Sequence, residues 1–194
     1  NPPKVIAPKL FILSVGVSQY QDSNFNLKSA DNDAAVLPNS FKAVAQSVYD
    51  EVKVTLLTNQ QASKKGVLQA LENLVNTTQK QDTVIIFLAG HGKTEKGIYH
   101  FLPYDMDITD ISNTGITDKD LALYAKKLPV TKVLILLDTC ESGSAAGNLQ
   151  VAMARGSDDK KIIAQLAKQK GAAVFSAASA TQLAYEIKRI GHGI

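Results

Sequence analysis

The chain has 194 residues, and its 21 Lys and Arg against 18 Asp and Glu give a formal net charge of +3. A hydrophobic content of 45% with 20% charged residues is typical of one globular domain and excludes a disordered chain. The single cysteine excludes a disulfide framework and any zinc site built on several cysteines, and the small, evenly spread charge does not indicate nucleic-acid binding.

The chain begins Asn-Pro-Pro-Lys without a methionine, and we interpret residues 1–8 as a linker that precedes one domain over residues 9–194. The longest apolar run, residues 10–17, is far shorter than the roughly 20 residues of a membrane span. It also lacks a signal peptide's cleavage pattern. We therefore predict a cytoplasmic protein with no membrane partner.

Five apolar runs of strand length recur along the chain. Continuous runs of β-branched residues and leucine, rather than strict alternation, are typical of strands that are buried on both faces of a parallel sheet. The runs cover residues 10–17, 52–57, 83–88, 132–137 and 172–177.

Helical patterns separate these runs, and the alternation predicts a three-layer α/β/α sandwich with a mainly parallel sheet. In the first helix, Pro38 either causes a kink or marks the start. The spacing predicts the inward residues Leu37, Phe41, Val44 and Val48 for this helix, and Val67, Leu71, Leu74 and Val75 for a second helix that is capped by Ser63. A third helix is predicted over residues 117–127, with Leu121, Tyr124 and Leu128 inward. A fourth is predicted to start at residues 157–159, with Ile162, Ile163, Leu166 and Ala167 inward.

One histidine and the only cysteine each follow an apolar run, and 49 residues separate His91 from Cys140. Side chains that follow neighbouring parallel strands meet at one edge of the sheet, where ligands bind in such folds. An imidazole beside a thiol is the working pair of a cysteine nucleophile. Gly90 and Gly92 flank the histidine, and the N–H groups of Gly92 and Cys140 are candidate oxyanion donors. The alternative for a lone cysteine is a small buried apolar residue.

The motifs around this pair resemble those of the caspase-like cysteine peptidases, which share the caspase-hemoglobinase fold, and within them metacaspases and bacterial caspase-like domains. Residues 82–92 are similar to the family's histidine strand and loop, residues 136–143 to its nucleophile loop, and residues 27–34 to its Asn-Asp-Ala segment. Caspases also place the histidine about 50 residues before the cysteine. Thr139 and Glu141 depart from the metacaspase sequence Asp-Cys-Cys-His-Ser-Gly, which has Cys and His there.

The resemblance implies a pocket for a basic side chain. Asp33 and Asp138 match the acids with which metacaspases hold Arg or Lys before the scissile bond, and carboxylates bind a guanidinium through charge-assisted hydrogen bonds. No arginine precedes Arg155, so the arginine of a caspase pocket is absent from the first loop. The predicted substrate is a protein or peptide with such a basic residue. The alternatives are a helix-start residue for Asp33 and a loop hydrogen-bonding residue for Asp138.

The resemblance requires no cofactor, although many metacaspases depend on calcium. Asp105, Asp107 and Asp110 fall close together in residues 104–110, but the loop lacks the glycine and glutamate of a calcium-binding loop. We therefore predict a solvated acidic loop and no metal site, with calcium dependence left open. His100, inside an apolar stretch, is predicted to be structural.

The resemblance also implies self-cleavage after a basic residue, with Arg155, Lys161 and Arg189 as candidates, against the alternative of ordinary solvated charges. The resemblance implies a further helix and strand after the last residue given. We expect either that the given sequence is cut short of them or that a second chain or an oligomer completes the sheet. The alternative to an active peptidase is a catalytically silent, partner-binding module of a larger protein. A nucleotide-binding domain is disfavoured because neither a Gly-x-Gly-x-x-Gly motif nor a P-loop occurs.

Overall fold

Five parallel strands form the central sheet in the order β2-β1-β3-β7-β8. The computed structural model describes residues 7–96, 98–139 and 173–176, and every statement below about the structure concerns those residues. Each predicted apolar run became a strand. Residues 10–17 and 84–88 are buried from both sides of the sheet, whereas residues 52–57 are exposed or half-buried. The strands are β1 (Lys9–Gly16), β2 (Glu51–Thr58), β3 (Thr83–Ala89), β7 (Lys132–Asp138) and β8 (Ala173–Ser176).

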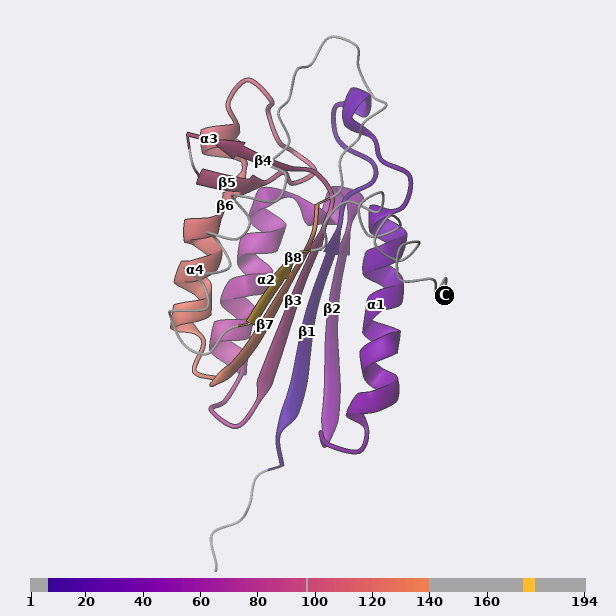
Figure 1. The fold of residues 1–194 in the computed structure, drawn as a ribbon, viewed down its shortest axis with the longest axis vertical. Coiled ribbons are helices and arrows are strands. Elements are labelled where there is room, and N and C mark those ends of the chain that lie inside the picture. The colour runs from indigo at the N-terminus through magenta and orange to yellow at the C-terminus, as the bar shows by residue number, and fades with distance from the viewer. Residues whose placement is uncertain (1–6, 97, 140–172, 177–194) are drawn as a thin grey trace, which may run out of the picture.

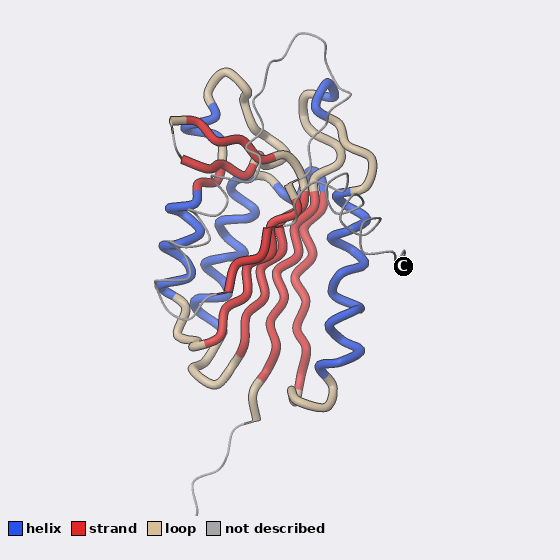
Figure 2. The backbone as a smooth tube through the Cα atoms, in the orientation of Figure 1, coloured by secondary structure: helices blue, strands red, loops and turns tan. Residues whose placement is uncertain are grey.

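Helices cover both faces of this sheet, as Figures 1 and 2 show. Helix α1 (Ala30–Ala45) lies on one face, and α2 (Lys64–Thr77) and α4 (Asp118–Lys127) lie on the other. Alternate residues of β1 and β3 therefore belong to different apolar clusters, one under each layer of helices. The predicted α/β sandwich with a mainly parallel sheet is confirmed.

The predicted inward face of the first helix was half right. Leu37 and Phe41 pack against the apolar clusters as predicted, but Val44 and Val48 are exposed. Helix α1 begins at Ala30 and continues through Pro38, while Val44 is 69% exposed and Val48, beyond the helix, is 63% exposed. The buried face consists of small residues and one proline, spaced mostly four apart: Ala30, Ala34, Pro38 and Ala45. Alanines face the sheet because the helix approaches it too closely for larger side chains.

A second, antiparallel sheet lies beyond the carboxyl ends of the parallel strands (Figure 1). It consists of β4 (Gly92–Glu95), β5 (Ile98–Phe101) and β6 (Ile116–Thr117), and the short helix α3 (Ile111–Thr114) precedes β6. The five apolar runs did not reveal it, since its strands have only two to four residues. It closes the carboxyl end of the larger apolar core with the side chains of Tyr99, Phe101 and Ile116.

Side-chain caps define where the helices on the second face begin. The Ser63 hydroxyl accepts the N–H of Gly66 at 3.2 Å, which confirms the predicted cap of α2. Thr117 and Asp120 form a capping box at α4. Single 3₁₀ turns, η1 (Ser23–Phe25) and η2 (Asn59–Ala62), follow β1 and β2.

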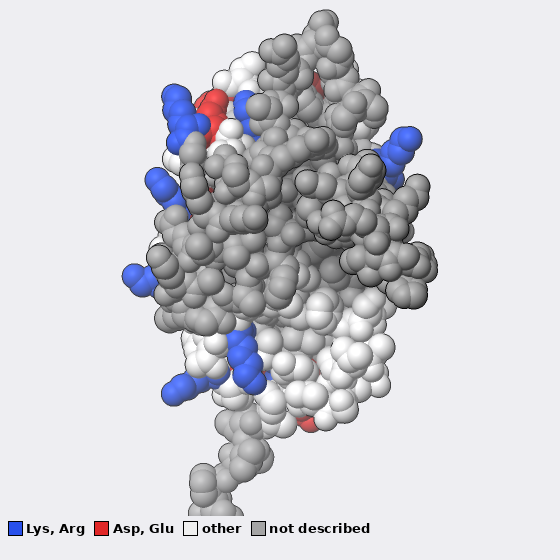
Figure 3. Space-filling model, viewed as in Figure 1, with Lys and Arg blue, Asp and Glu red and all other residues white. Residues whose placement is uncertain are grey.

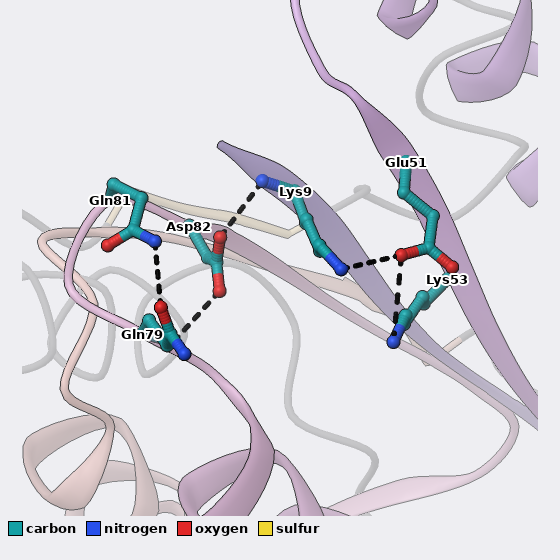
Figure 4. A network of polar contacts seen from close by, with 6 residues as sticks. All are labelled: Lys9, Glu51, Lys53, Gln79, Gln81 and Asp82. Atoms are coloured by element: carbon teal, nitrogen blue, oxygen red, sulfur yellow. Dashed lines mark hydrogen bonds and ion pairs between the residues drawn. The ribbon is translucent and has the colours of Figure 1, made fainter. Parts of the chain in front are cut away.

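The amino ends of the strands are joined by a polar network around a buried carboxylate (Figure 4). Asp82 is 3% exposed, and its carboxylate accepts the backbone N–H of Lys9 at 2.9 Å and that of Gln79 at 2.8 Å. Lys9 Nζ lies 2.8 Å from Glu51 in an exposed ion pair. The network links β1, β2 and the start of β3 at the end of the sheet opposite to the candidate site.

One face of the molecule shows how the described charged side chains are distributed. In the view of Figure 3, the visible Lys and Arg side chains are spread around the edge of the molecule rather than gathered on one element. The absence of a nucleic-acid partner stays a prediction. Among the described residues, no helix combines the length and the apolar character that crossing a membrane requires.

Candidate active site

The carboxyl ends of three neighbouring strands lie in one row. Gly16 of β1 pairs with Ala89 of β3, and Ala89 pairs with Asp138 of β7. The next residue, Gly90, continues the row, because its N–H donates to the carbonyl of Asp138 at 3.1 Å. The chain that leaves β3 toward His91 therefore lies beside the chain that leaves β7. Cys140, two residues after Asp138 in the sequence, lies outside the described residues.

Both glycines of the Gly-His-Gly sequence are required by close packing. Gly90 has a φ of +152°, and a Cβ atom there would lie 2.9 Å from Tyr20 Oη. A Cβ atom at Gly92 would lie 2.8 Å from the ring and hydroxyl of Tyr99 and 3.0 Å from Thr139 Cβ. These side chains therefore seat the histidine loop closely between Tyr20, Tyr99 and the end of β7.

His91 is held on three sides and is 1% exposed. Its backbone N–H donates to Tyr20 Oη at 2.8 Å, and its ring lies 5.1 Å from the Tyr20 ring and edge-on to Phe25 at 6.3 Å, centroid to centroid. Nε2 lies 2.8 Å from the carbonyl oxygen of Phe25. A carbonyl only accepts, so Nε2 carries the proton and the neutral ring presents its lone pair at Nδ1. Nδ1 is buried and has no hydrogen-bond partner among the described residues.

The surroundings of His91 favour the neutral ring. Burial lowers its pKa below the usual 6.5, and the hydrogen bond to the Phe25 carbonyl offsets part of this effect. The hydroxyl against its backbone belongs to Tyr20, whose own pKa is raised by burial, so that this neighbour carries no charge at neutral pH. A neutral imidazole with a lone pair at Nδ1 is the form that accepts a proton.

This lowered pKa predicts a pH-dependent stability. Below about pH 6.5 the unfolded chain binds a proton that the buried ring resists, so stability present above that pH is lost as the pH falls. We expect the free energy of unfolding of the unchanged protein to fall between about pH 7.5 and about pH 5.5, and to fall more than that of a His91→Gln variant. The difference between the two falls is expected to be no more than about 1.4 kcal/mol. Urea titrations at several pH values measure this difference, in which the other titrating groups cancel. Parallel curves for the two proteins would contradict it.

The two predicted pocket acids lie on the same side of the sheet. Leu136 packs with Ala30, Ala34 and Ala89 on the α1 face, and side chains alternate along a strand, so Asp138 also belongs to that face. Asp33 is half-buried in the first turn of α1, where its N–H donates to the Ser29 carbonyl at 2.8 Å.

The sequence analysis missed the other carboxylate in that turn, Asp31. Asp31 accepts hydrogen bonds from Ser18 Oγ at 2.6 Å and Asn59 Nδ2 at 3.0 Å, and these bonds lower its pKa, that from Ser18 most. The amide oxygen of Asn59, whose φ is +50°, also accepts the N–H groups of Ser18 and Gln19. This network links the ends of β1 and β2 to the start of α1. The signal in the sequence was that Ser18 and Asn59 each lie within two residues of the end of a strand.

Two carboxylates of the acidic loop accept hydrogen bonds locally, whereas that of Asp105 accepts the backbone N–H of Lys64 at the start of α2 at 2.7 Å. Asp107 accepts hydrogen bonds from the backbone N–H and the hydroxyl of Thr109, and Asp110 accepts from the amide of Asn113. In the part of the chain that the structure describes, no three metal-ligating side chains gather. His100 is 3% exposed within β5. The candidate cleavage residues Arg155, Lys161 and Arg189 and the helix predicted at residues 157–167 lie outside the described residues.

Comparison with known proteins identifies the family. A model of the Caspase domain family matches residues 10–193. The chain belongs to this family. The curated protein Metacaspase-1 of Meyerozyma guilliermondii is 26% identical over 148 residues, which are 69% of this chain and 35% of that protein. Together these findings indicate a caspase-like domain.

A solved structure shares the fold of this caspase-domain protein. Protein GSU0716 from Geobacter sulfurreducens has a TM-score of 0.54 and 21% identity, over 71% of this chain and 52% of that chain. The structure of pro-sf-caspase-1 has a TM-score of 0.47 and 13% identity, over 78% and 53% of the two chains. The chain therefore spans about a third of its curated relative and about half of each of these solved chains.

Proposed function

We propose that the protein is a cysteine endopeptidase that cleaves after Arg or Lys, with Cys140 as the nucleophile and His91 as the general acid and base. The observation that carries this proposal is the hydrogen bond from the Gly90 N–H to the Asp138 carbonyl. It holds the histidine loop beside the end of the strand that leads, two residues later, to the cysteine. The fixed Nε2–H tautomer supports the same assignment, because it leaves Nδ1 available for proton transfer.

In the proposed mechanism, His91 Nδ1 takes the proton of the Cys140 thiol, and the thiolate attacks the scissile carbonyl carbon. The N–H groups of Gly92 and Cys140 stabilise the oxyanion that forms. The protonated imidazole gives its proton to the leaving amine as the C–N bond breaks, which leaves a thioester on Cys140. Nδ1 then removes a proton from water, whose oxygen attacks the thioester, and the proton returns to the thiolate as the acid product leaves.

Specificity follows in this proposal from Asp33 and Asp138, which belong to one face of the sheet. Asn at either position keeps the size of the side chain and removes its charge. We expect Asp33→Asn to lower kcat/KM for peptides ending in Arg by about 10- to 100-fold, chiefly through KM, which corresponds to one lost hydrogen bond between charged groups. Asp110→Asn, in the distant acidic loop, is the matched control.

The test measures cleavage of fluorogenic peptides that end in Arg, Lys or Asp, each with and without added calcium. Cleavage after Arg or Lys that is lost in Cys140→Ala supports the proposal. Cleavage only with added calcium would show that the peptidase also needs this cation. Cleavage after Asp would contradict the pocket. Activity toward none of the peptides would favour the silent, partner-binding module. The cytoplasmic location and a second chain that completes the sheet stay predictions.

Self-cleavage is part of the same proposal. A peptidase that cuts after basic residues is expected to cut its own chain after Arg155, Lys161 or Arg189, which gives fragments of defined mass. We expect intact-mass spectrometry to find these fragments in the protein and not in Cys140→Ala. Identical masses for the two proteins would exclude self-cleavage at these positions and leave cleavage of other substrates unaffected.

A further inference from the structure

We propose that Asn26 is a positioning residue for His91: its side chain closes a ring of contacts that fixes the orientation and the tautomer of the imidazole. The kinetic part of this inference rests on the proposed function, whereas the structural part concerns His91 alone. Asn26 is an exposed residue directly after η1, in the loop between β1 and α1.

Four residues form this ring. Asn26 Oδ1 accepts the backbone N–H of Tyr20 at 2.8 Å. Tyr20 Oη accepts the backbone N–H of His91 at 2.8 Å, and the Phe25 carbonyl accepts the His91 Nε2–H at 2.8 Å. The peptide bond between Phe25 and Asn26 completes the ring. The two atoms that hold His91 therefore belong to one loop, and the Asn26 side chain joins the two parts of that loop.

Other contacts of the loop are independent of the Asn26 side chain. The Leu27 N–H donates to the Ser18 carbonyl at 2.7 Å, which closes the base of the loop, and the Gln21 N–H donates to the Tyr104 carbonyl at 3.0 Å. We therefore expect the loop to form without the Asn26 amide, but with more freedom for the Phe25 carbonyl relative to the Tyr20 hydroxyl.

That freedom has a chemical consequence. The Phe25 carbonyl keeps the proton on Nε2, and without a fixed acceptor there the proton distributes between both ring nitrogens. In the Nδ1–H tautomer, Nδ1 has no lone pair with which to accept the proton of a thiol. The fraction of protein ready for proton transfer falls, which lowers kcat, whereas substrate binding and KM stay nearly unchanged.

Imidazole ¹⁵N NMR spectra of the whole protein test the structural part, with the His91 signals assigned through His91→Gln. We expect the Nε2–H tautomer in the protein, a mixture of tautomers in Asn26→Ala, and restoration in Asn26→Asp, which keeps an acceptor oxygen. Asn24→Ala is the matched control, because the Asn24 side chain makes no hydrogen bond within the described residues. A His91 spectrum of Asn26→Ala equal to that of the unchanged protein would overturn the inference.

Kinetics test the consequence. We expect Asn26→Ala to lower kcat by about 10-fold with KM within about twofold, and Asn26→Asp and Asn24→Ala to keep kcat within about twofold. Should Asn26→Ala fail to fold, Asn26→Gln displaces the amide by one methylene and is expected to show the same tautomer mixture. If no peptide is cleaved, the proposed function fails while the NMR result still decides the role of Asn26. An unchanged kcat in an active Asn26→Ala would overturn that role.

Discussion

Replacing His91 with glutamine is expected to lower kcat/KM toward Arg and Lys peptides by about 10³-fold, because general acid–base catalysis contributes about 10²- to 10⁴-fold. Glutamine has nearly the length of histidine, and its amide can still donate to the Phe25 carbonyl that holds Nε2. It cannot accept the proton of a thiol. The variant therefore tests proton transfer rather than the packing of the loop, and initial rates with saturating and dilute peptide measure the effect.

Three further variants sharpen this test. Cys140→Ala is expected to remove at least as much activity, and the double variant is expected to be no worse than Cys140→Ala, because residues that act as one unit are not additive. His100→Gln makes the same substitution at a second buried histidine, which is 3% exposed in β5, and is expected to keep kcat/KM within about twofold in the molecules that fold. His91→Gln with more than about a tenth of the original activity would exclude His91 as the general base.

Replacing Gly16 with alanine is expected to lower the free energy of unfolding by about 3 kcal/mol, at the upper end of the usual cost of overpacking. A Cβ atom there would lie against the Ala30 carbonyl oxygen, 2.6 Å from Ala34 Cβ and 2.8 Å from Asp31 Cα. None of these atoms can rotate away, so the first turn of α1 must move. Urea unfolding measures the loss, and an unchanged midpoint would contradict the close approach of the helix.

The same movement is expected to disturb the proposed pocket, since Asp31 and Asp33 lie in that turn. Asp82→Ala is the control for stability alone, because it leaves two backbone N–H groups without their acceptor, at about 2 kcal/mol, at the other end of the sheet. We expect KM for Arg peptides to rise in Gly16→Ala and to stay unchanged in Asp82→Ala. Adding Ala34→Gly to Gly16→Ala is expected to recover part of the lost stability, because one of the close contacts disappears.

The strands could be predicted from sequence because burial on both faces leaves a local record. Each fully buried Val, Leu or Ile side chain contributes about 1.5–3 kcal/mol, so central strands accumulate such residues in uninterrupted runs. The inward face of α1 could not be predicted in the same way. Its buried positions are mostly alanines, because the helix lies close to Gly16 and leaves no room there for larger side chains. Large residues such as Val44 are exposed instead. Hydrophobicity alone therefore placed Leu37 and Phe41 correctly but placed Val44 and Val48 wrongly.

The sequence by itself determined the fold class, the family and the candidate pair of His91 and Cys140, because apolar runs and short motifs are properties of neighbouring residues. Only the tertiary structure decided what surrounds the histidine. Phe25 and Tyr20 lie 66 and 71 residues before His91, and Asn26 acts through both. Their contacts depend on the path of a loop after a different strand, and a backbone carbonyl, which every residue possesses, leaves no signature in the sequence. The tautomer of the imidazole therefore follows from the packing of strands β1 and β3.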